Sequence, residues 1–420
     1  MYGSQKDIRH NLKVFVIDGI SFMPSMAFIS ITAVIPFFLY QLGASTFQIA
    51  LAAAMTMICG FFSQPLFGVI ASHSTAMNRT FGKILLIQRL IFLLFVLLIP
   101  VFASEHALLV TLFLIFWAIF NIFAGSYAIF HTPLVLKLLP PDQRGAIRGM
   151  GHAIGSFIGV GMTALIPLIL LRFAFPYNFM VVFACGLFFL LANALIFFLM
   201  RQSKDAVPNE PMDVGQYIKQ MPSSIRENRA FRAMILTCLF LAIANALLPY
   251  YTLYAISAFS ATEAHIATLT GLAILFGAVA HIGFGYVADR YGPRVVAILA
   301  ACFTVAAGAI AFGTHSLNFL FVAWVLANIS NSGFPLIVTL LLGEVSPATK
   351  LPLYVGVHTA ISMALSTVVV LLLAPALEHI GFGSLFVLVL ACGILSLLAN
   401  LFVLRKRLVK SQGQKYLDKI

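Results

Sequence analysis

The chain has 420 residues, of which 61% are hydrophobic and 9% are charged, and its formal net charge at pH 7 is +12. A soluble domain is about half apolar and about a quarter charged. A water-soluble fold could not bury this much apolar surface, so we expect a membrane protein whose main partner is the lipid bilayer. Basic residues flank the long apolar runs, so membrane topology explains the positive charge better than nucleic-acid binding, and no nucleic-acid partner is expected.

The cysteines give no sign of a disulfide or a metal site. All five lie inside apolar runs, at positions 59, 185, 238, 302 and 392, and no CxxC pair occurs. No motif indicates a metal or a cofactor either. The first apolar run, from about Val14 to Tyr40, is too long for a cleavable signal peptide and is interpreted as a membrane span.

Apolar runs separated by charge, glycine and proline predict twelve transmembrane helices. Helix is the expected state, because backbone groups in lipid must form their hydrogen bonds within the segment. The expected spans, in chain order, are 12–40, 46–71, 82–103, 106–138, 146–171, 177–200, 231–257, 264–288, 293–313, 317–342, 352–376 and 382–404.

The distribution of Lys and Arg predicts the topology. When the N-terminus is placed inside, nearly all basic residues fall in segments on the inner side of the membrane. Only Arg89, within a span, and Arg172, on the outer side, depart from this pattern. The positive-inside rule therefore predicts a multi-pass protein of the cell membrane with both termini in the cytoplasm.

The longest polar stretch, residues 201–230, separates the first six expected spans from the last six. It contains three prolines and is interpreted as a cytoplasmic linker with a short surface helix near 213–221. The predicted organisation is an N-terminal six-helix bundle over 1–200, the linker over 201–230, and a C-terminal six-helix bundle with a short basic tail over 231–420.

The two groups of spans repeat one another. Each contains one of the two tryptophans, followed four residues later by an asparagine, in "WAIFN" from Trp117 and in "WVLAN" from Trp324. Proline also recurs at matching places of the first and seventh spans, as Pro36 and Pro249. This register predicts a duplicated six-helix unit, and parallel repeats of that kind are typical of transporters.

The stretch "GYVADRYGPR", between the eighth and ninth spans, is unusually charged for this chain. It resembles the loop motif of the major facilitator superfamily, and the matching residues are Gly285, Ala288, Asp289, Arg290, Gly292 and Arg294. Residues 139–149, "LPPDQRGAIRG", resemble the superfamily's loop after the fourth span through Arg144 and Gly145. The first-half copy of the loop motif is degraded, because Ser72 stands where an aspartate is expected.

The resemblance implies an all-α membrane fold of two pseudo-symmetric six-helix bundles and transport by alternating access. We expect Gly285 to let helices approach and Gly292 to permit a tight turn. Asp289 and the arginines would pair with neighbouring helix ends in one conformation and release them in the other. We call this pairing and release a latch. The alternative role is anchoring by positive charge at the membrane surface. Both roles suit Arg294 equally, whereas an acid such as Asp289 adds nothing to anchoring.

Asp18 is the only acid inside a span, and ionisable residues in lipid are functional candidates. Arg89 lies at a similar depth, so we expect an ion pair between the two, which is either static or part of a proton-titrating site. Four histidines also lie within spans, at 131, 152, 281 and 358. Of the four, His131 is the leading candidate for a proton relay. Packing is the commoner role of a buried histidine.

By the resemblance, the substrate path lies near the membrane midplane on the first, fourth, seventh and tenth spans. The polar candidates there are Asn121, Tyr127, Asn245, Asn328 and Asn331. Neutral amides and aromatic rings suit an uncharged or weakly charged organic solute. Hydrogen bonding between helices is the alternative role, and for Asn121 and Asn328 both roles stay open.

The leading hypothesis is a monomeric secondary transporter of a small-molecule substrate, without a cofactor and with protons as the candidate coupling ion. Export of a drug-like compound or metabolite is its first form. Uptake of a sugar-like or other metabolite, or facilitated diffusion, is its second form. A membrane-embedded enzyme is a remote alternative, because Asp18 and the histidines show no known catalytic spacing.

Overall fold

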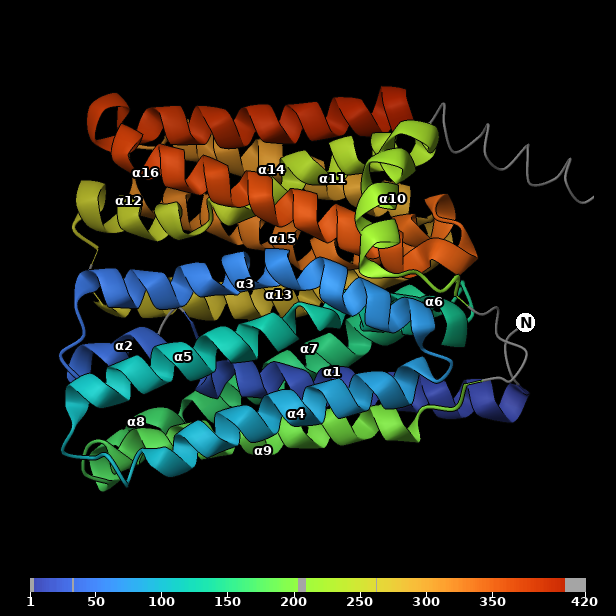
Figure 1. The fold of residues 1–420 in the computed structure, drawn as a ribbon. Coiled ribbons are helices and arrows are strands. Elements are labelled where there is room, and N and C mark those ends of the chain that lie inside the picture. Colours follow the sequence, from blue (N-terminus) through green and yellow to red (C-terminus); the bar gives the residue numbers. More distant parts are fainter. Residues whose placement is uncertain (1–3, 32–33, 203–208, 262, 405–420) are drawn as a thin grey trace, which may run out of the picture. The chain divides into compact units, whose positions relative to one another are not determined.

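The computed structural model describes residues 4–31, 34–202, 209–261 and 263–404. All its regular elements are helical, and no β-strand occurs in these residues (Figure 1). The α-helices are α1 (Gln5–Phe28), α2 (Val34–Gln41), α3 (Thr46–His73), α4 (Met77–Leu98), α5 (His106–Ala124), α6 (Ser126–Leu138), α7 (Arg144–Thr163), α8 (Leu165–Arg172), α9 (Tyr177–Leu199), α10 (Val214–Glu227), α11 (Arg229–Ala246), α12 (Pro249–Phe259), α13 (Glu263–Tyr291), α14 (Pro293–Gly313), α15 (Leu317–Val345) and α16 (Leu351–Leu398). A 3₁₀ turn, η1 (Ala348–Lys350), precedes α16, and a π-helical segment, η2 (Ala399–Leu404), follows it. The predicted basic tail after residue 404 lies outside the described residues.

Among the described residues, eleven helical segments are long and apolar enough to cross a membrane. They correspond to the second to twelfth predicted spans. Over the first predicted span, 12–40, the chain forms α1 and α2, and neither is among the eleven. α1 begins in a charged stretch and carries Asp18, and α2 has only 8 residues. The prediction of an all-helical membrane protein is confirmed.

Four predicted spans contain a break in their helix. The breaks separate α1 from α2, α5 from α6, α7 from α8, and α11 from α12. Pro249 explains the last of these, because it begins α12 and has no N–H to continue the hydrogen bonding of α11. Gly125 lies at the α5–α6 break, where the Ser63 hydroxyl occupies the space that a side chain would need. The first and seventh spans are therefore both broken a few residues before the proline that the repeat shares, Pro36 or Pro249.

Two glycines in the last third of the chain adopt positive φ angles. Gly292, between α13 and α14, has φ 86°, and Gly381 within α16 has φ 69°. Gly381 divides α16 at the boundary between the eleventh and twelfth predicted spans. A side chain is disfavoured at such angles, so both turns depend on glycine.

Contacts between residues divide the chain into two compact units. The first comprises residues 1–140 and 150–214, and the second comprises residues 141–149 and 215–420. The start of α7 therefore belongs to the second unit, and residues 209–214 of the predicted linker belong to the first. The predicted domain limits at residues 200 and 231 stay predictions.

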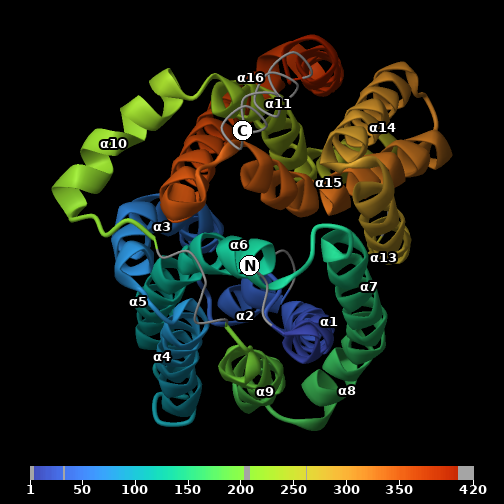
Figure 2. The same cartoon turned by 90° about the vertical axis from the view of Figure 1, so that its right-hand side faces the viewer.

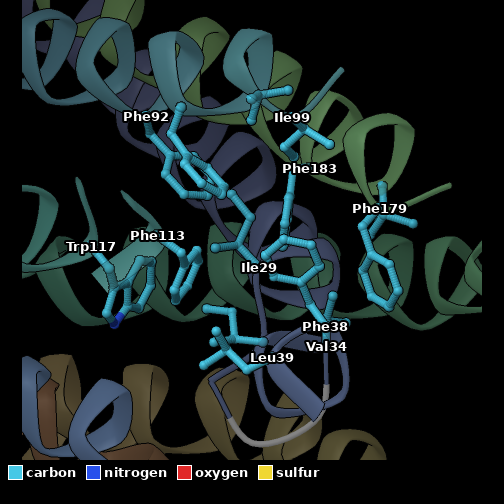
Figure 3. Close-up of a cluster of buried hydrophobic side chains, with 14 of the residues drawn as sticks. Ile29, Val34, Phe38, Leu39, Phe92, Ile99, Phe113, Trp117, Phe179 and Phe183 are labelled. Atoms are coloured by element: carbon cyan, nitrogen blue, oxygen red, sulfur yellow. The ribbon is translucent and has the colours of Figure 1, made fainter. Parts of the chain in front are cut away.

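The core of the first unit is rich in phenylalanine (Figure 3). Phe38 of α2 meets Phe113 of α5 and Phe183 of α9 edge-on, with ring centroids 5.7 and 5.2 Å apart. Phe92 of α4 and Trp117 of α5 adjoin them, with centroids 6.1 Å apart. Lipid tails are as apolar as these rings, so the cluster stabilises the unit by close packing rather than by transfer from water.

In the second unit, α14 packs against both α15 and α16 (Figure 2). The buried face of α14 consists mainly of alanine, glycine and threonine. Gly308 of α14 faces the backbone of Leu390, and Gly393 of α16 faces Val305. A larger side chain at either glycine would push the helices apart, so small residues set the close spacing of α14 and α16.

The first part of the predicted linker is bound to the first unit. Asn209 donates to the carbonyl of Ala71 at 2.9 Å and accepts from the Lys137 ammonium at 2.9 Å. The Met212 N–H donates to the hydroxyl of Ser72 at 3.1 Å. Ser72, which replaces the expected motif aspartate, therefore holds the segment that follows α9.

Candidate functional site

Three buried polar side chains from three helices meet in the first unit. The Asp18 carboxylate on α1 lies 2.9 Å from Nε2 of His131 on α6, measured from Oδ2. Asn193 on α9 donates from Nδ2 to Asp18 Oδ1 at 2.8 Å. Asp18 and His131 are each 2% exposed, and Asn193 is 0% exposed. Two residues that the sequence indicated separately therefore form one site, together with an asparagine that it did not indicate.

Close helix packing brings Asp18 to this position. Gly19 leaves no room for a side chain against the backbone of Gly151, so α1 and α7 touch directly there. Asp18 reaches α9, against which α1 also packs. Ser21, one turn later on α1, donates to the Asp18 carbonyl at 3.0 Å and accepts from Asn193 Nδ2 at 3.2 Å. The carboxylate is therefore fixed through its own helix as well as through α6 and α9.

Aromatic rings enclose His131. Tyr127, one turn earlier on α6, stacks on the imidazole with ring centroids 4.8 Å apart and 14° between the planes. Phe15 and Phe197 make edge contacts with it at 5.9 and 6.3 Å. Tyr127, a predicted substrate-path residue, thus lies beside the Asp18–His131 pair. A ring face attracts a cation, so these surroundings suit a protonated imidazole as well as a neutral one.

Arg89 does not form the ion pair with Asp18 that we expected from the sequence. It is 2% exposed, its Nε donates to the Leu190 carbonyl at 3.4 Å, and its Nη1 contacts Gln88 Oε1. The two side chains within hydrogen-bond distance of the Asp18 carboxylate are instead His131 of α6 and Asn193 of α9. Arg89 still lies close enough to Asp18 for an electrostatic interaction, so an ionised Asp18 compensates its charge.

A second arrangement lies in the second unit, where Asp289 on α13 meets the start of α7. Its two carboxylate oxygens accept hydrogen bonds from the backbone N–H groups of Gly145 and Ala146, each at 2.7 Å. A helix start leaves such N–H groups without partners, and the helix dipole adds attraction for an anion. Gly145 and Gly285 permit the contact, because a side chain on either would collide with the carbonyl oxygen of the other.

The arginines of the two loop motifs have different surroundings. Arg294 at the start of α14 donates from Nε and Nη2 to the carbonyl of Asn400, at 3.1 and 2.9 Å. It thereby caps the helical end of the last predicted span. Arg290 is exposed and donates to the Tyr286 hydroxyl at 2.6 Å, and Arg144 is the first residue of α7. The structure thus gives Asp289 a contact of the kind expected for the latch, and Arg294 a capping contact.

The substrate-path asparagines differ in their partners. Asn121 and Asn328 each donate from Nδ2 to the carbonyl of the tryptophan four residues earlier, at 2.8 and 2.9 Å. The same side-chain hydrogen bond therefore occurs in both halves of the repeat. Asn245 Nδ2 and the hydroxyl of Tyr251 are buried and have no hydrogen-bond partner among the described residues, and Asn331 is exposed. Asn245 and Tyr251 therefore each carry a buried polar atom whose hydrogen-bonding capacity is unused among the described residues.

Sequence reasoning missed Asn193 and a contact of Arg148. Arg148 counted only toward topology, yet its Nη1 donates to the hydroxyl of Thr339 on α15 at 2.8 Å. An asparagine in an otherwise apolar span was the available signal for Asn193, since such a residue must find hydrogen-bond partners in the protein. No cluster of His, Cys, Asp and Glu that could hold a metal ion occurs in the part of the chain that the structure describes.

Comparisons with known proteins give a family match for part of the sequence and a similarity of fold for nearly the whole chain. Residues 233–418 match the model described as Major Facilitator Superfamily. No curated protein matches the sequence. The structure is similar to that of a major facilitator superfamily proton:xylose symporter, with a TM-score of 0.70 and 14% identity over 96% of this chain and 97% of the other. The E. coli fucose:proton symporter gives a TM-score of 0.71 at 16% identity, over 94% and 98%. A bacterial homologue of the iron transporter ferroportin gives 0.68 at 16%, over 96% and 99%. At these identities the similarity is one of fold, along nearly the whole of each chain.

Proposed function

We propose that this chain is a proton-coupled carrier of a neutral organic solute. Residues 233–418 match the Major Facilitator Superfamily in sequence, and the fold along nearly the whole chain is that of the superfamily's solved structures. The family match of residues 233–418 and the similarity of fold support membrane transport. The coupling ion, the class of solute and the direction of transport are the proposal.

The buried contact between Asp18 and His131 carries the proposal of proton coupling. With Asp18 ionised and His131 neutral, the charges of Asp18 and Arg89 compensate one another inside the first unit. A proton added to this site leaves a net positive charge in an apolar interior, which is costly unless the surroundings rearrange. Protonation therefore favours one conformation over another, as coupling to a proton gradient requires.

The contact of Asp289 with the start of α7 supports a carrier that alternates between conformations. A carboxylate on the N–H groups of a helix start can separate from them without disrupting an apolar core. The released N–H groups and carboxylate can then be hydrated at the membrane surface. Contacts of this type suit a switch between two discrete states.

Asn245 and Tyr251 support a neutral solute that carries hydroxyl groups. They lie on opposite sides of the α11–α12 break, and each has a buried polar atom without a partner among the described residues. Leaving such a group unsatisfied costs about 1 to 3 kcal/mol, and a solute hydroxyl would satisfy it. The ring of Trp324, with its centroid 5.9 Å from that of Tyr251, offers an apolar surface to the same solute.

The direction of transport has two forms. Export, in which solute and proton move in opposite directions, is the first form from the sequence. Uptake, in which they move together, is favoured by two proteins of the same fold, a proton:xylose symporter and a fucose:proton symporter. The sign of the coupling distinguishes the two forms.

Solute accumulation in proteoliposomes under an imposed pH gradient tests the proposal. The panel consists of radiolabelled neutral sugars, amphipathic drugs and amino acids. We expect at least one neutral solute to accumulate against its own gradient, and to leak back when a protonophore removes the pH gradient. Accumulation driven by an acidic lumen indicates exchange and hence export, whereas accumulation driven by an acidic exterior indicates symport and hence uptake.

Two variants provide the control. Asp18→Asn should abolish accumulation while leaving downhill transport measurable. Glu105→Gln changes an exposed acid and should behave as the wild type. Equal transport with and without the gradient, unchanged in Asp18→Asn, would show a facilitator and contradict proton coupling.

A further inference from the structure

The end of α9 in the first unit is held by two neighbouring helices. Asn78 of α4 donates from Nδ2 to the carbonyls of Phe197 and Met200, at 3.2 and 2.9 Å. Asn11 of α1 donates from Nδ2 to the carbonyl of Arg201 at 2.8 Å. The starts of α1 and α4 therefore adjoin the end of α9, and by the predicted topology this is the cytoplasmic end (Figure 2).

Five exposed basic side chains lie near this end, and we call them the basic rim. They are Lys6, Arg9 and Lys13 of α1 and Arg79 and Lys83 of α4. None of the five forms a hydrogen bond or an ion pair with another residue in the described part of the chain. Apart from the buried Asp18, the only acid of the three helices is Asp7, and Arg201 pairs with it at 3.2 Å. The basic rim therefore carries five positive charges that no described residue neutralises.

The basic residues of α4 lie on the same helix face as a strip of exposed apolar side chains. These side chains are between 48% and 57% exposed, and they belong to Ile87, Leu90, Leu94 and Leu97. At about 100° per residue, the strip and the two basic residues fall within a sector of roughly 80°. In a membrane-spanning segment such a strip faces acyl chains, because the protein buries the opposite face. Arg79 and Lys83 then stand at the headgroup end of the same strip.

α9 places a second exposed strip beside the first. Leu195 and Leu199, in its last turns, are 54% and 59% exposed. Gly82 of α4 faces the ring of Phe198, so the two helices approach closely at the level of the basic rim. The carbonyl groups at the end of α9 accept hydrogen bonds from α1 and α4, which lowers their repulsion of an anion. The end of α9 thus combines an apolar surface for acyl chains with positive charge at the membrane surface.

The charge of a phospholipid headgroup decides how much it gains from the basic rim. The positive-inside rule requires basic residues on one side of the membrane, but not their concentration beside one helix end. Each Lys or Arg near an anionic membrane surface contributes about five-fold in binding. A zwitterionic headgroup such as phosphocholine brings its own cation to the rim, and it therefore gains less than a headgroup with a net negative charge.

We propose that the basic rim, together with the exposed strips of α4 and α9, binds a phospholipid with a net negative headgroup, such as phosphatidylglycerol. Its phosphate lies between the rim residues of α1 and those of α4, and its acyl chains follow the two strips. The site lies on the surface of the first unit, apart from the buried Asp18–His131 pair. Its occupant is a lipid of the bilayer, and neither the solute nor the coupling ion.

Quenching of a fluorophore by lipids with brominated acyl chains tests the proposal on the full-length protein in liposomes. Leu195→Cys carries the fluorophore beside the basic rim, and Leu97→Cys carries it on the strip of α4, roughly 27 Å from Arg79. The bilayers mix phosphatidylcholine and phosphatidylglycerol, and either one or the other is brominated. At Leu195→Cys we expect phosphatidylglycerol to quench more strongly than phosphatidylcholine at equal mole fraction. At Leu97→Cys the two lipids should quench equally, and the labelled wild type corrects for the native cysteines.

Neutralising two charges of the basic rim tests its role. Arg79→Gln together with Lys83→Gln should raise the mole fraction of phosphatidylglycerol that gives half of the maximal quenching at Leu195→Cys, by about five-fold or more. Lys219→Gln together with Arg226→Gln is the matched control, because it removes two exposed basic residues of α10, and it should leave this fraction unchanged.

The α1 side of the basic rim and the dependence on salt give two further measurements. Arg9→Gln together with Lys13→Gln should cause a shift like that of the α4 pair, since the phosphate lies between the two helices. Raising the ionic strength needs no rim variant, and it should weaken the preference of the wild type for phosphatidylglycerol, because exposed charges are screened.

Three results would overturn the proposal. The first is equal quenching by both lipids at Leu195→Cys with the basic rim intact. The second is an equal shift in the α4 pair and in the α10 control, which would show attraction by net charge alone. The third is displacement of phosphatidylglycerol by glycerol phosphate in the aqueous buffer, which would show a site for a soluble phosphate compound instead.

Discussion

Asp18, His131 and Arg89 are all buried in the first unit, but only Asp18 and His131 are in direct contact. The two oxygens of the Asp18 carboxylate lie against side chains of α6 and α9, whereas Arg89 contacts Gln88 and the Leu190 carbonyl. Depth along a span identified Asp18 and Arg89 as possible partners. Depth does not specify which helix face each residue occupies, and that face determines which charged groups meet.

A double-mutant cycle distinguishes the two pairings. The coupling free energy between Asp18→Asn and His131→Gln should reach about 1 to 3 kcal/mol, because the two side chains share a buried hydrogen bond. The coupling between Asp18→Asn and Arg89→Met should be smaller, since no direct ion pair connects those residues. The measurement is the free energy of unfolding in detergent for each single and double variant. A larger coupling for Arg89 than for His131 would show that the pair predicted from the sequence is the real one.

At the scale of elements, apolar runs located the membrane spans well and the breaks within them poorly. The second to twelfth predicted spans correspond to the eleven segments, among the described residues, that are long and apolar enough to cross a membrane. The α5–α6 break lies at Gly125, where the Ser63 hydroxyl of α3 occupies the space of a side chain, a contact between helices far apart in sequence. Such tertiary contacts leave no periodic signal in the sequence.

The loop after α3 shows how a degraded motif can take a different partner. Ser72 binds the Met212 N–H, and Met212 is only 3% exposed. The carbonyl of Ala71, the preceding residue, accepts a hydrogen bond from Asn209. The loop that lacks the motif aspartate therefore binds the segment after α9 to the first unit.

Cysteine labelling measures how firmly this segment is held. Met212→Cys should react slowly with a membrane-impermeant maleimide, after correction for the native cysteines. Adding Ser72→Ala removes one hydrogen-bond acceptor, worth about 1 kcal/mol, and should raise the labelling rate about five-fold. Ile218→Cys, at a position that is 52% exposed, should react quickly with or without Ser72→Ala. Fast labelling of Met212→Cys in the wild-type background would mean that the segment is not docked.

At the scale of the whole molecule, the superfamily fold was predictable because its evidence is distributed along the chain. Apolar runs, the repeated Trp-x-x-x-Asn pattern and the loop after the eighth span all indicated it, and the structural comparisons confirm it. The meeting of Asp18, His131 and Asn193 was not predictable. Asp18 is 113 residues from His131 and 175 from Asn193, and no local pattern records contacts over such separations. The cytoplasmic placement of both termini stays a prediction.

The central claim is that solute transport moves protons through the Asp18–His131 site. The most direct measurement is the internal pH of proteoliposomes, read with a trapped dye, when a transported solute is added without any imposed gradient. The wild type and Glu105→Gln should show a solute-dependent pH change, and Asp18→Asn and His131→Gln should lose it. A solute that enters without moving protons in the wild type, or a pH change that persists in both site variants, would contradict the claim.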